Sequence, residues 1–153
     1  MTQSEIWSIQ DINSFIVVLS EYVSDKCECG ENLEALSLPE RVFYITQSLE
    51  MEVNNGGFSQ FFYNSSGNLS NELVHAFTEI GAEATAAICK RALDAFGQEL
   101  PPDQDERQQL LDELESDEID EILEECDNAF YNYEDDLNSL NHAYVLKNKA
   151  CFA

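Results

Sequence analysis

Apolar residues recur at spacings of three and four along most of this chain, which is the pattern of helices with one buried face. Between residues 9 and 23 the repeat consists of Ile9, Ile12, Ile16, Leu19 and Val23. No segment shows the sustained alternation that is typical of a half-buried strand. The chain has 153 residues, 44% of them hydrophobic, which is enough for a core. We therefore predict an all-α fold: a compact bundle of six to eight helices in a single domain, residues 1–153.

The clearest helix start is Ser37-Leu38-Pro39-Glu40, where Ser37 can cap the helix and Glu40 can bond back three residues later. The face predicted to be buried consists of Leu38, Val42, Ile45, Leu49 and Val53. The helix is expected to stop at residues 54–57, where two glycines permit positive φ.

Residues 25–31 are expected to form a loop, residues 58–63 a short aromatic segment and residues 64–68 a turn. Ser70 is the expected cap of the next helix, and Pro101-Pro102 breaks the chain as a candidate hinge. The predicted helices cover residues 70–80, 82–96, 105–115, 117–133 and 137–149.

The charge of the chain is its most unusual property. It has 31 acidic against 7 basic residues, a formal net charge of −24 and an isoelectric point near 4.1. Such a field repels nucleic acids and anionic membranes and attracts basic partners. We therefore expect no direct nucleic-acid or membrane binding. An acidic surface that serves only solubility is the plain alternative.

The acidic residues are concentrated in residues 103–136. This stretch contains sixteen of them and one basic residue, Arg107, which gives a net charge of −15. Apolar residues thread this stretch at helical spacing, so it is not a disordered tail. We predict that its carboxylates form a partner-binding face: Asp103, Asp105, Glu106, Asp112, Glu113, Glu115, Asp117, Glu118, Asp120, Glu121, Glu124, Glu125, Asp127, Glu134, Asp135 and Asp136.

The carboxylates are densest between residues 117 and 127. A helix rises about 15 Å over this span, so its seven carboxylates give about one charge per 2 Å of axis. Duplex DNA presents one phosphate charge per about 1.7 Å of its axis. A protein surface built to neutralise phosphates could therefore accept this helix.

No residues point to catalysis, a metal or a cofactor. The chain lacks the common nucleophile and phosphate-binding motifs. The pair Glu72 and His75 has the spacing of a di-iron ligand pair, but no second pair completes the site. Five scattered cysteines fit reduced thiols, and the N-terminus lacks the features of a signal peptide, so we expect a cytoplasmic protein.

The most specific string is EVNNGGFSQFFYN at residues 52–64. We interpret it as a structural motif, a glycine turn followed by an aromatic plug, and its key residues are Asn54, Asn55, Gly56, Gly57, Phe58, Gln60 and Phe61. A ligand or dimer contact at this turn is the open alternative.

This string resembles the motif of a bacterial family of small acidic proteins, catalogued as a domain of unknown function, that includes a DNA-mimic protein. The preceding Arg41-Val42-Phe43-Tyr44 and the later Gly67 agree with the family pattern, and the resemblance covers about residues 38–96. It implies a helical fold, a homodimer, and an acidic surface that occupies a DNA-binding protein.

Three functions follow as hypotheses. The first is a DNA mimic that binds a basic DNA-binding protein, such as a helix-turn-helix regulator or a nucleoid protein, and blocks its DNA binding without catalysis. The second is a small acidic enzyme or ligand-binding protein with a pocket near the glycine turn. The third is a helical scaffold whose acidity is incidental.

Overall fold

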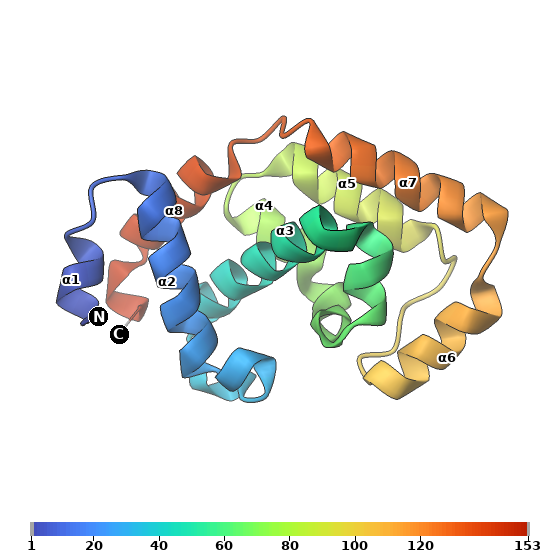
Figure 1. Ribbon diagram of the computed structural model, residues 1–153, viewed down its shortest axis with the longest axis horizontal. Helices are drawn as coiled ribbons and strands as arrows, with labels where there is room; N and C mark the ends of the chain where they lie inside the picture. The colour runs from blue at the N-terminus through green and yellow to red at the C-terminus, as the bar shows by residue number, and fades with distance from the viewer. Residues whose placement is uncertain (1, 153) are drawn as a thin grey trace. The chain divides into compact units, whose positions relative to one another are not determined.

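The computed structural model describes residues 2–152, and these contain eight α-helices and no strand. The all-α prediction is therefore confirmed. The α-helices are α1 (Gln3–Trp7), α2 (Ile12–Lys26), α3 (Leu38–Tyr63), α4 (Leu73–Glu79), α5 (Glu83–Asp94), α6 (Gln104–Leu114), α7 (Asp117–Tyr131) and α8 (Leu137–Lys147) (Figure 1). Four short 3₁₀ helices, η1 (Glu28–Gly30), η2 (Leu33–Ala35), η3 (Ser65–Glu72) and η4 (Lys149–Cys151), connect or follow them.

The predicted helices agree with the structure in the second half of the chain and differ from it at four places in the first. The prediction lacks α1 (Gln3–Trp7). Residues 9–11 precede α2 instead of belonging to it. Ser70 does not cap α4; it is buried in η3, where its hydroxyl donates to the carbonyl of Gly67. The fourth difference is that α3 continues to Tyr63, across a kink at Gly57, because the aromatic segment is itself helical.

The chain divides into two compact units. The first unit comprises Met1–Tyr44 and Asp136–Ala153, and the second comprises Ile45–Asp135. Each is described by itself below. The single-domain expectation stays a prediction, because compact units of one chain need not fold separately.

The first unit has a core in which α1, α2 and α8 meet the start of α3. Its fully buried side chains include Phe15, Leu19, Phe43, Val145 and Phe152. The ring of Phe43 lies edge-on to that of Phe152, with centroids 6.1 Å apart. The described ends of the chain lie side by side in this unit (Figure 1).

The predicted capping box at the start of α3 is confirmed. The Glu40 backbone N–H donates to the Ser37 hydroxyl at 3.2 Å, and the Ser37 N–H donates to the Glu40 carboxylate at 2.9 Å. The carboxylate is fully buried and also pairs with Lys26 at 2.9 Å. Leu38, however, is 80% exposed, so the buried face of the helix begins at Val42.

The second unit is built around phenylalanine rings from several helices. Phe58, Phe61 and Phe62 of α3 are fully buried, so the aromatic plug of the motif is core material. The ring of Phe62 stands edge-on to Phe96 with centroids 5.3 Å apart, and Phe58 stands edge-on to Phe130 of α7 at 6.3 Å. The contact between Phe58 and Phe130 packs α7 against the end of α3.

Arg107 anchors α6 in the second unit. Although it lies in the most acidic stretch, its side chain is fully buried. Its guanidinium donates to the carbonyls of Phe62 (2.6 Å) and Asn64 (2.7 Å) at the end of α3, and to those of Pro101 (3.1 Å) and Pro102 (2.9 Å). The last carbonyls of a helix lack internal partners and carry partial negative charge, so a buried cation is stabilised there.

Gly67 makes room for this arrangement. A Cβ atom at Gly67 would lie 2.7 Å from Nε of Arg107 and 2.8 Å from the carbonyl oxygen of Phe61. Only a residue without a side chain lets η3 come this close to the guanidinium. Burial lowers the pKa of Arg107 and the nearby Asp103 carboxylate raises it, but a guanidinium stays protonated in proteins.

We predict that Arg107→Met lowers the free energy of unfolding by about 3 kcal/mol or more, because several buried carbonyls lose their donor at about 1–3 kcal/mol each. Urea unfolding followed by circular dichroism measures this change. Gln109→Met, at an exposed position of the same helix, should change stability by less than about 0.5 kcal/mol. Equal stability of the two variants would contradict the anchoring role.

Candidate functional site

Two consecutive helices, α6 and α7, carry most of the predicted partner-binding carboxylates. Each begins at a side-chain cap: the Asp103 carboxylate accepts from the Glu106 N–H at 2.9 Å, and the Ser116 hydroxyl accepts from the Ile119 N–H at 3.2 Å. Glu115 and Ser116 alone separate the helices. The caps therefore place two acidic helices end to end within one unit.

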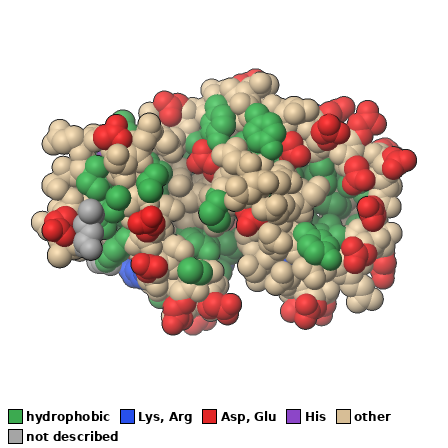
Figure 2. All heavy atoms as spheres, viewed as in Figure 1, with side chains coloured by type: hydrophobic (Ala, Val, Ile, Leu, Met, Phe, Trp, Pro, Cys, Tyr) green, Lys and Arg blue, Asp and Glu red, His purple; other side chains and the backbone are tan. Residues whose placement is uncertain are grey.

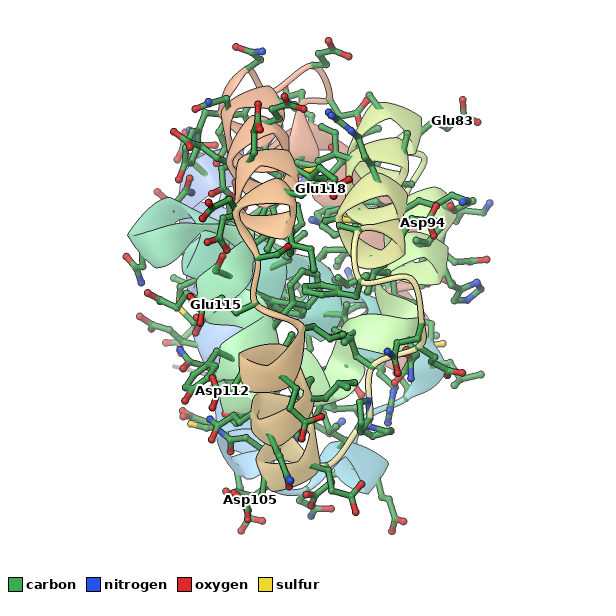
Figure 3. All side chains as sticks on the ribbon, turned by 90° about the vertical axis from the view of Figure 1, so that its right-hand side faces the viewer. Glu83, Asp94, Asp105, Asp112, Glu115 and Glu118 are labelled. Atoms are coloured by element: carbon green, nitrogen blue, oxygen red, sulfur yellow. The ribbon has the colours of Figure 1, made fainter. Side chains whose placement is uncertain are left out.

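Thirteen of the sixteen predicted acids are exposed within the second unit. We call these residues the acidic face: Asp103, Asp105, Glu106, Asp112, Glu113, Glu115, Asp117, Glu118, Asp120, Glu121, Glu124, Glu125 and Glu134. In Figure 3, Asp105 and Asp112 lie on α6, Glu115 follows at the end of that helix, and Glu118 lies near the start of α7. Figure 2 shows acidic side chains gathered over these two helices, at the right-hand edge.

The other three predicted acids have structural partners. Asp127 is half-buried and bonds to the backbone of α3, as described below. Asp135 is half-buried, and its carboxylate accepts from the N–H (2.8 Å) and the hydroxyl (2.9 Å) of Thr85. This carboxylate thereby gives the first turn of α5 a hydrogen-bond partner. Asp136 belongs to the first unit, where it caps α8 through Ser139. We therefore leave these three out of the acidic face.

The position of each acid on α7 follows from the helical period. At about 100° per residue, the apolar stripe of Ile119, Ile122, Leu123, Cys126 and Phe130 covers one side of the helix. The seven carboxylates fall outside this stripe. Asp127 and Glu118 each lie about 40° from its nearest member, on opposite flanks, so the helical angle alone does not separate the half-buried Asp127 from the exposed Glu118.

Few basic side chains neutralise the acidic face. Arg107 is the only Lys or Arg between residues 92 and 146, and its side chain is buried. Arg91 of α5 pairs with Glu125. Lys90 pairs with Asp94 of its own helix at 2.6 Å. The surface of α6 and α7 is therefore as negative as the sequence suggests.

The glycine turn of the motif is a break inside α3. Gly57 has φ 86° and ψ −179°, a conformation that is essentially restricted to glycine. The positive φ predicted for this turn is confirmed at Gly57, and Gly56 does not share it. Because the chain changes direction at Gly57, the backbone groups on both sides of the break need partners from elsewhere.

Helix α7 supplies those partners. The Asp127 carboxylate accepts a hydrogen bond of 2.7 Å from the N–H of Phe58, the first residue after the break. The Tyr131 hydroxyl donates to the carbonyl of Val53 at 2.8 Å. Just after α7, the Tyr133 hydroxyl accepts from the Asn54 side chain at 2.9 Å, a bond between side chains. The motif is thus the part of the second unit against which α7 packs.

The remaining polar residues of the motif brace the break from the other side. The Glu52 carboxylate accepts from the amide of Gln60 at 3.0 Å and from that of Asn64 at 3.1 Å. Asn55 is exposed. Sequence reasoning missed the roles of Glu52, Tyr131 and Tyr133, because their partners are separated from them by the break or by most of the second unit.

Three residues of the motif, Ser59, Phe62 and Tyr63, border a cavity. Asn54 and Gln60 are engaged in the bonds above, and neither lines the cavity beside the motif. Among residues 2–152, no cluster of three or more His, Cys, Asp or Glu side chains is arranged to hold a metal ion. No helix in that range combines the length and hydropathy needed to cross a membrane.

We predict that Gly57→Ala is destabilising by about 1–3 kcal/mol, because Ala is strained in this conformation and its Cβ would collide with the Asp127 carboxylate. Gly97 also has positive φ (69°) but open space around it, so Gly97→Ala measures the cost of the backbone alone, about 1 kcal/mol. Thermal or urea unfolding compares the two. A smaller loss for Gly57→Ala than for Gly97→Ala would contradict the role of this close approach.

Substitutions of Asp127 test separately the charge of its side chain and its hydrogen bond to the Phe58 N–H. Burial raises the pKa of its carboxyl, and the Phe58 N–H lowers it less. The folded state therefore holds this proton at higher pH than the unfolded state. The contribution of this carboxyl to the stability of the wild type falls as pH rises from the ordinary carboxyl range through the raised pKa. Asp127→Asn keeps an acceptor for Phe58 and has no charge to bury.

The expected result is that Asp127→Asn is at least as stable as wild type at pH 7 and loses this advantage in acid. Asp127→Ala leaves the Phe58 N–H without its partner and should be less stable than Asp127→Asn by about 1–3 kcal/mol. Urea unfolding of the three proteins between pH 3.5 and 7, about the range of carboxyl titration, provides the test. Equal stability of the Asn and Ala variants would show that the hydrogen bond contributes nothing.

Comparison with known proteins agrees with this architecture. The family model of the DMP19-like proteins matches residues 34–148, which include the broken helix α3, both acidic helices and the contacts between them. No curated protein and no solved structure matches the chain. Since the match covers most of the chain, this protein belongs to the DMP19-like family.

Proposed function

We propose that this protein is a DNA mimic, whose acidic face occupies the DNA-binding surface of a basic protein and keeps that protein from DNA. The observation that carries the proposal is the row of exposed carboxylates on α6 and α7, whose only intervening base is buried. Membership of the DMP19-like family supports it.

The rigidity of the acidic face also favours mimicry. A flexible acidic tail must be ordered when it binds, which costs conformational entropy. Here the carboxylates project from helices that are held by Arg107 and by the bonds between α7 and the motif. A protein surface preorganised for phosphates would meet charges of comparable spacing that are already in place.

The partner we expect is a DNA-binding protein with a groove lined by Lys and Arg, such as a helix-turn-helix regulator or a nucleoid protein. Binding would involve no cofactor and no catalysis. We also propose that the protein acts in the cytoplasm, and that it forms a homodimer, as the family resemblance implies. Sedimentation analysis of the purified chain tests the dimer.

The alternative of a small enzyme or ligand-binding protein has less support. It requires polar groups of the glycine turn that converge on a bound molecule. Asn54 and Gln60 instead bond to Tyr133 and Glu52 within the fold.

A charge-matched pair of variants tests the proposal. Glu118, Glu121 and Glu124 lie exposed on α7, and changing all three to Gln removes three charges from the acidic face. Changing Glu21, Glu31 and Glu34, exposed residues of the first unit, gives the same net charge with the face intact. Circular dichroism checks that both variants fold.

The wild-type protein is immobilised, and basic proteins that it retains and that duplex DNA releases are collected. Each of them is then assayed by mobility shift with its DNA and increasing amounts of wild type or variant. We expect the wild type and the first-unit variant to displace the DNA, and the α7 variant to need about tenfold more protein. That factor corresponds to about 1.4 kcal/mol of lost binding free energy. Binding should weaken as salt rises, because the attraction is screened. A partner that holds DNA and this protein together would refute mimicry.

A further inference from the structure

An apolar pocket opens within the acidic face. Its volume is about 220 Å³. Its lining includes side chains of α6 and α7 and of the broken end of α3, all within the second unit. Phosphates, which the acidic face imitates, offer a protein charge and hydrogen-bond acceptors but no apolar pocket, so charge mimicry does not explain this feature.

The floor and walls of the pocket are hydrophobic. Phe62, Phe96 and Leu123 are buried at its base, while Leu111, Leu114 and Ile119 are half-buried around it. These last three belong to the apolar faces of α6 and α7, and their partial exposure means that the core does not close over them. Covering them with an apolar group from outside would remove further hydrocarbon surface from water.

The rim of the pocket is acidic. Asp112 of α6, Glu115 between the helices and Asp120 of α7 line it, and all three are exposed. Figure 3 shows Asp112 on α6 and Glu115 where the chain leaves α6 toward α7. Three carboxylates around an apolar opening favour a group that is itself apolar and carries cations on either side.

The size of the pocket restricts what can enter. Sites for small molecules usually measure about 300–1,000 Å³, and this pocket is smaller. It suits one large apolar side chain. Protein interfaces commonly depend on such an anchor side chain in a pocket, surrounded by polar contacts.

We propose that this pocket receives one apolar side chain, Leu, Ile, Met or Phe, from the basic partner, while flanking Lys or Arg residues pair with Asp112, Glu115 and Asp120. This inference rests on the proposed function and adds a contact that phosphate mimicry alone does not supply. The pocket would let the protein select among basic proteins, and would give binding a component that high salt does not remove.

Two synthetic helical peptides test the proposal. Both are alanine-based and carry the same lysines on one face, and the residue between the lysines is Leu in one and Ala in the other. Fluorescence anisotropy measures their binding at about 50 mM and about 300 mM salt. We expect the Leu peptide to bind about tenfold more tightly, which corresponds to the burial of about two methylene groups. The ratio should persist at the higher salt, although both affinities fall.

A matched pair of protein variants locates the effect. Ser59 is exposed at the border of the pocket, so Ser59→Phe fills the opening without disturbing the core. Gln109→Phe adds the same ring to α6 away from the pocket. Ser59→Phe should abolish the preference for Leu, and Gln109→Phe should retain it. In the wild type, methyl NMR signals of Leu111, Leu114 and Ile119 should shift with the Leu peptide and not with the Ala peptide.

The outcomes separate the two proposals. Equal binding of both peptides that is lost at high salt would overturn the pocket and leave the acidic face intact. Methyl signals that respond to both peptides alike would also overturn the pocket, whatever the fate of Ser59→Phe. If neither peptide binds at low salt, the acidic face itself does not attract basic helices, and both proposals fail.

Discussion

The break in α3 at Gly57 is the constraint on which the second unit depends. A helix that changes direction frees backbone groups on both sides of the break, and these must find partners in a buried setting. Asp127, Tyr131 and Tyr133 supply partners at the break, and Arg107 supplies donors at the end of the helix. The hydrogen bonds that satisfy α3 are thus the same bonds that hold α6 and α7 in position.

This arrangement explains how the protein tolerates its charge. Thirteen exposed carboxylates in one unit repel one another and oppose compaction. The opposing terms are a phenylalanine core and a few charged groups that are turned inward with partners: Arg107 on four carbonyls and Asp127 on the Phe58 N–H. Since those partners are backbone groups, the inward charges leave the carboxylates of the face available to a partner protein.

Charge and hydrophobic surface have different uses on this face. Carboxylates attract any basic surface over about a Debye length and speed the encounter, but they discriminate poorly among basic partners. The pocket between α6 and α7 would discriminate by shape and hydrophobicity. The two proposals therefore divide recognition into a long-range step and a short-range step, both carried by the same two helices.

Local sequence patterns predict the helical class, the cap at Ser37, the positive φ at the glycine turn and the outward position of most carboxylates. These depend on local spacing and on the conformational freedom of single residues, which a sequence displays directly. The burial of Arg107, the contacts of Asp127 and Asp135 with other helices, the continuation of α3 past Gly57 and the pocket in the acidic face emerge only in the tertiary structure. Each of these depends on partners distant in the chain. A charged side chain can be buried only where the fold offers it a hydrogen-bond partner, here a backbone group. Helical periodicity does not show where such partners lie.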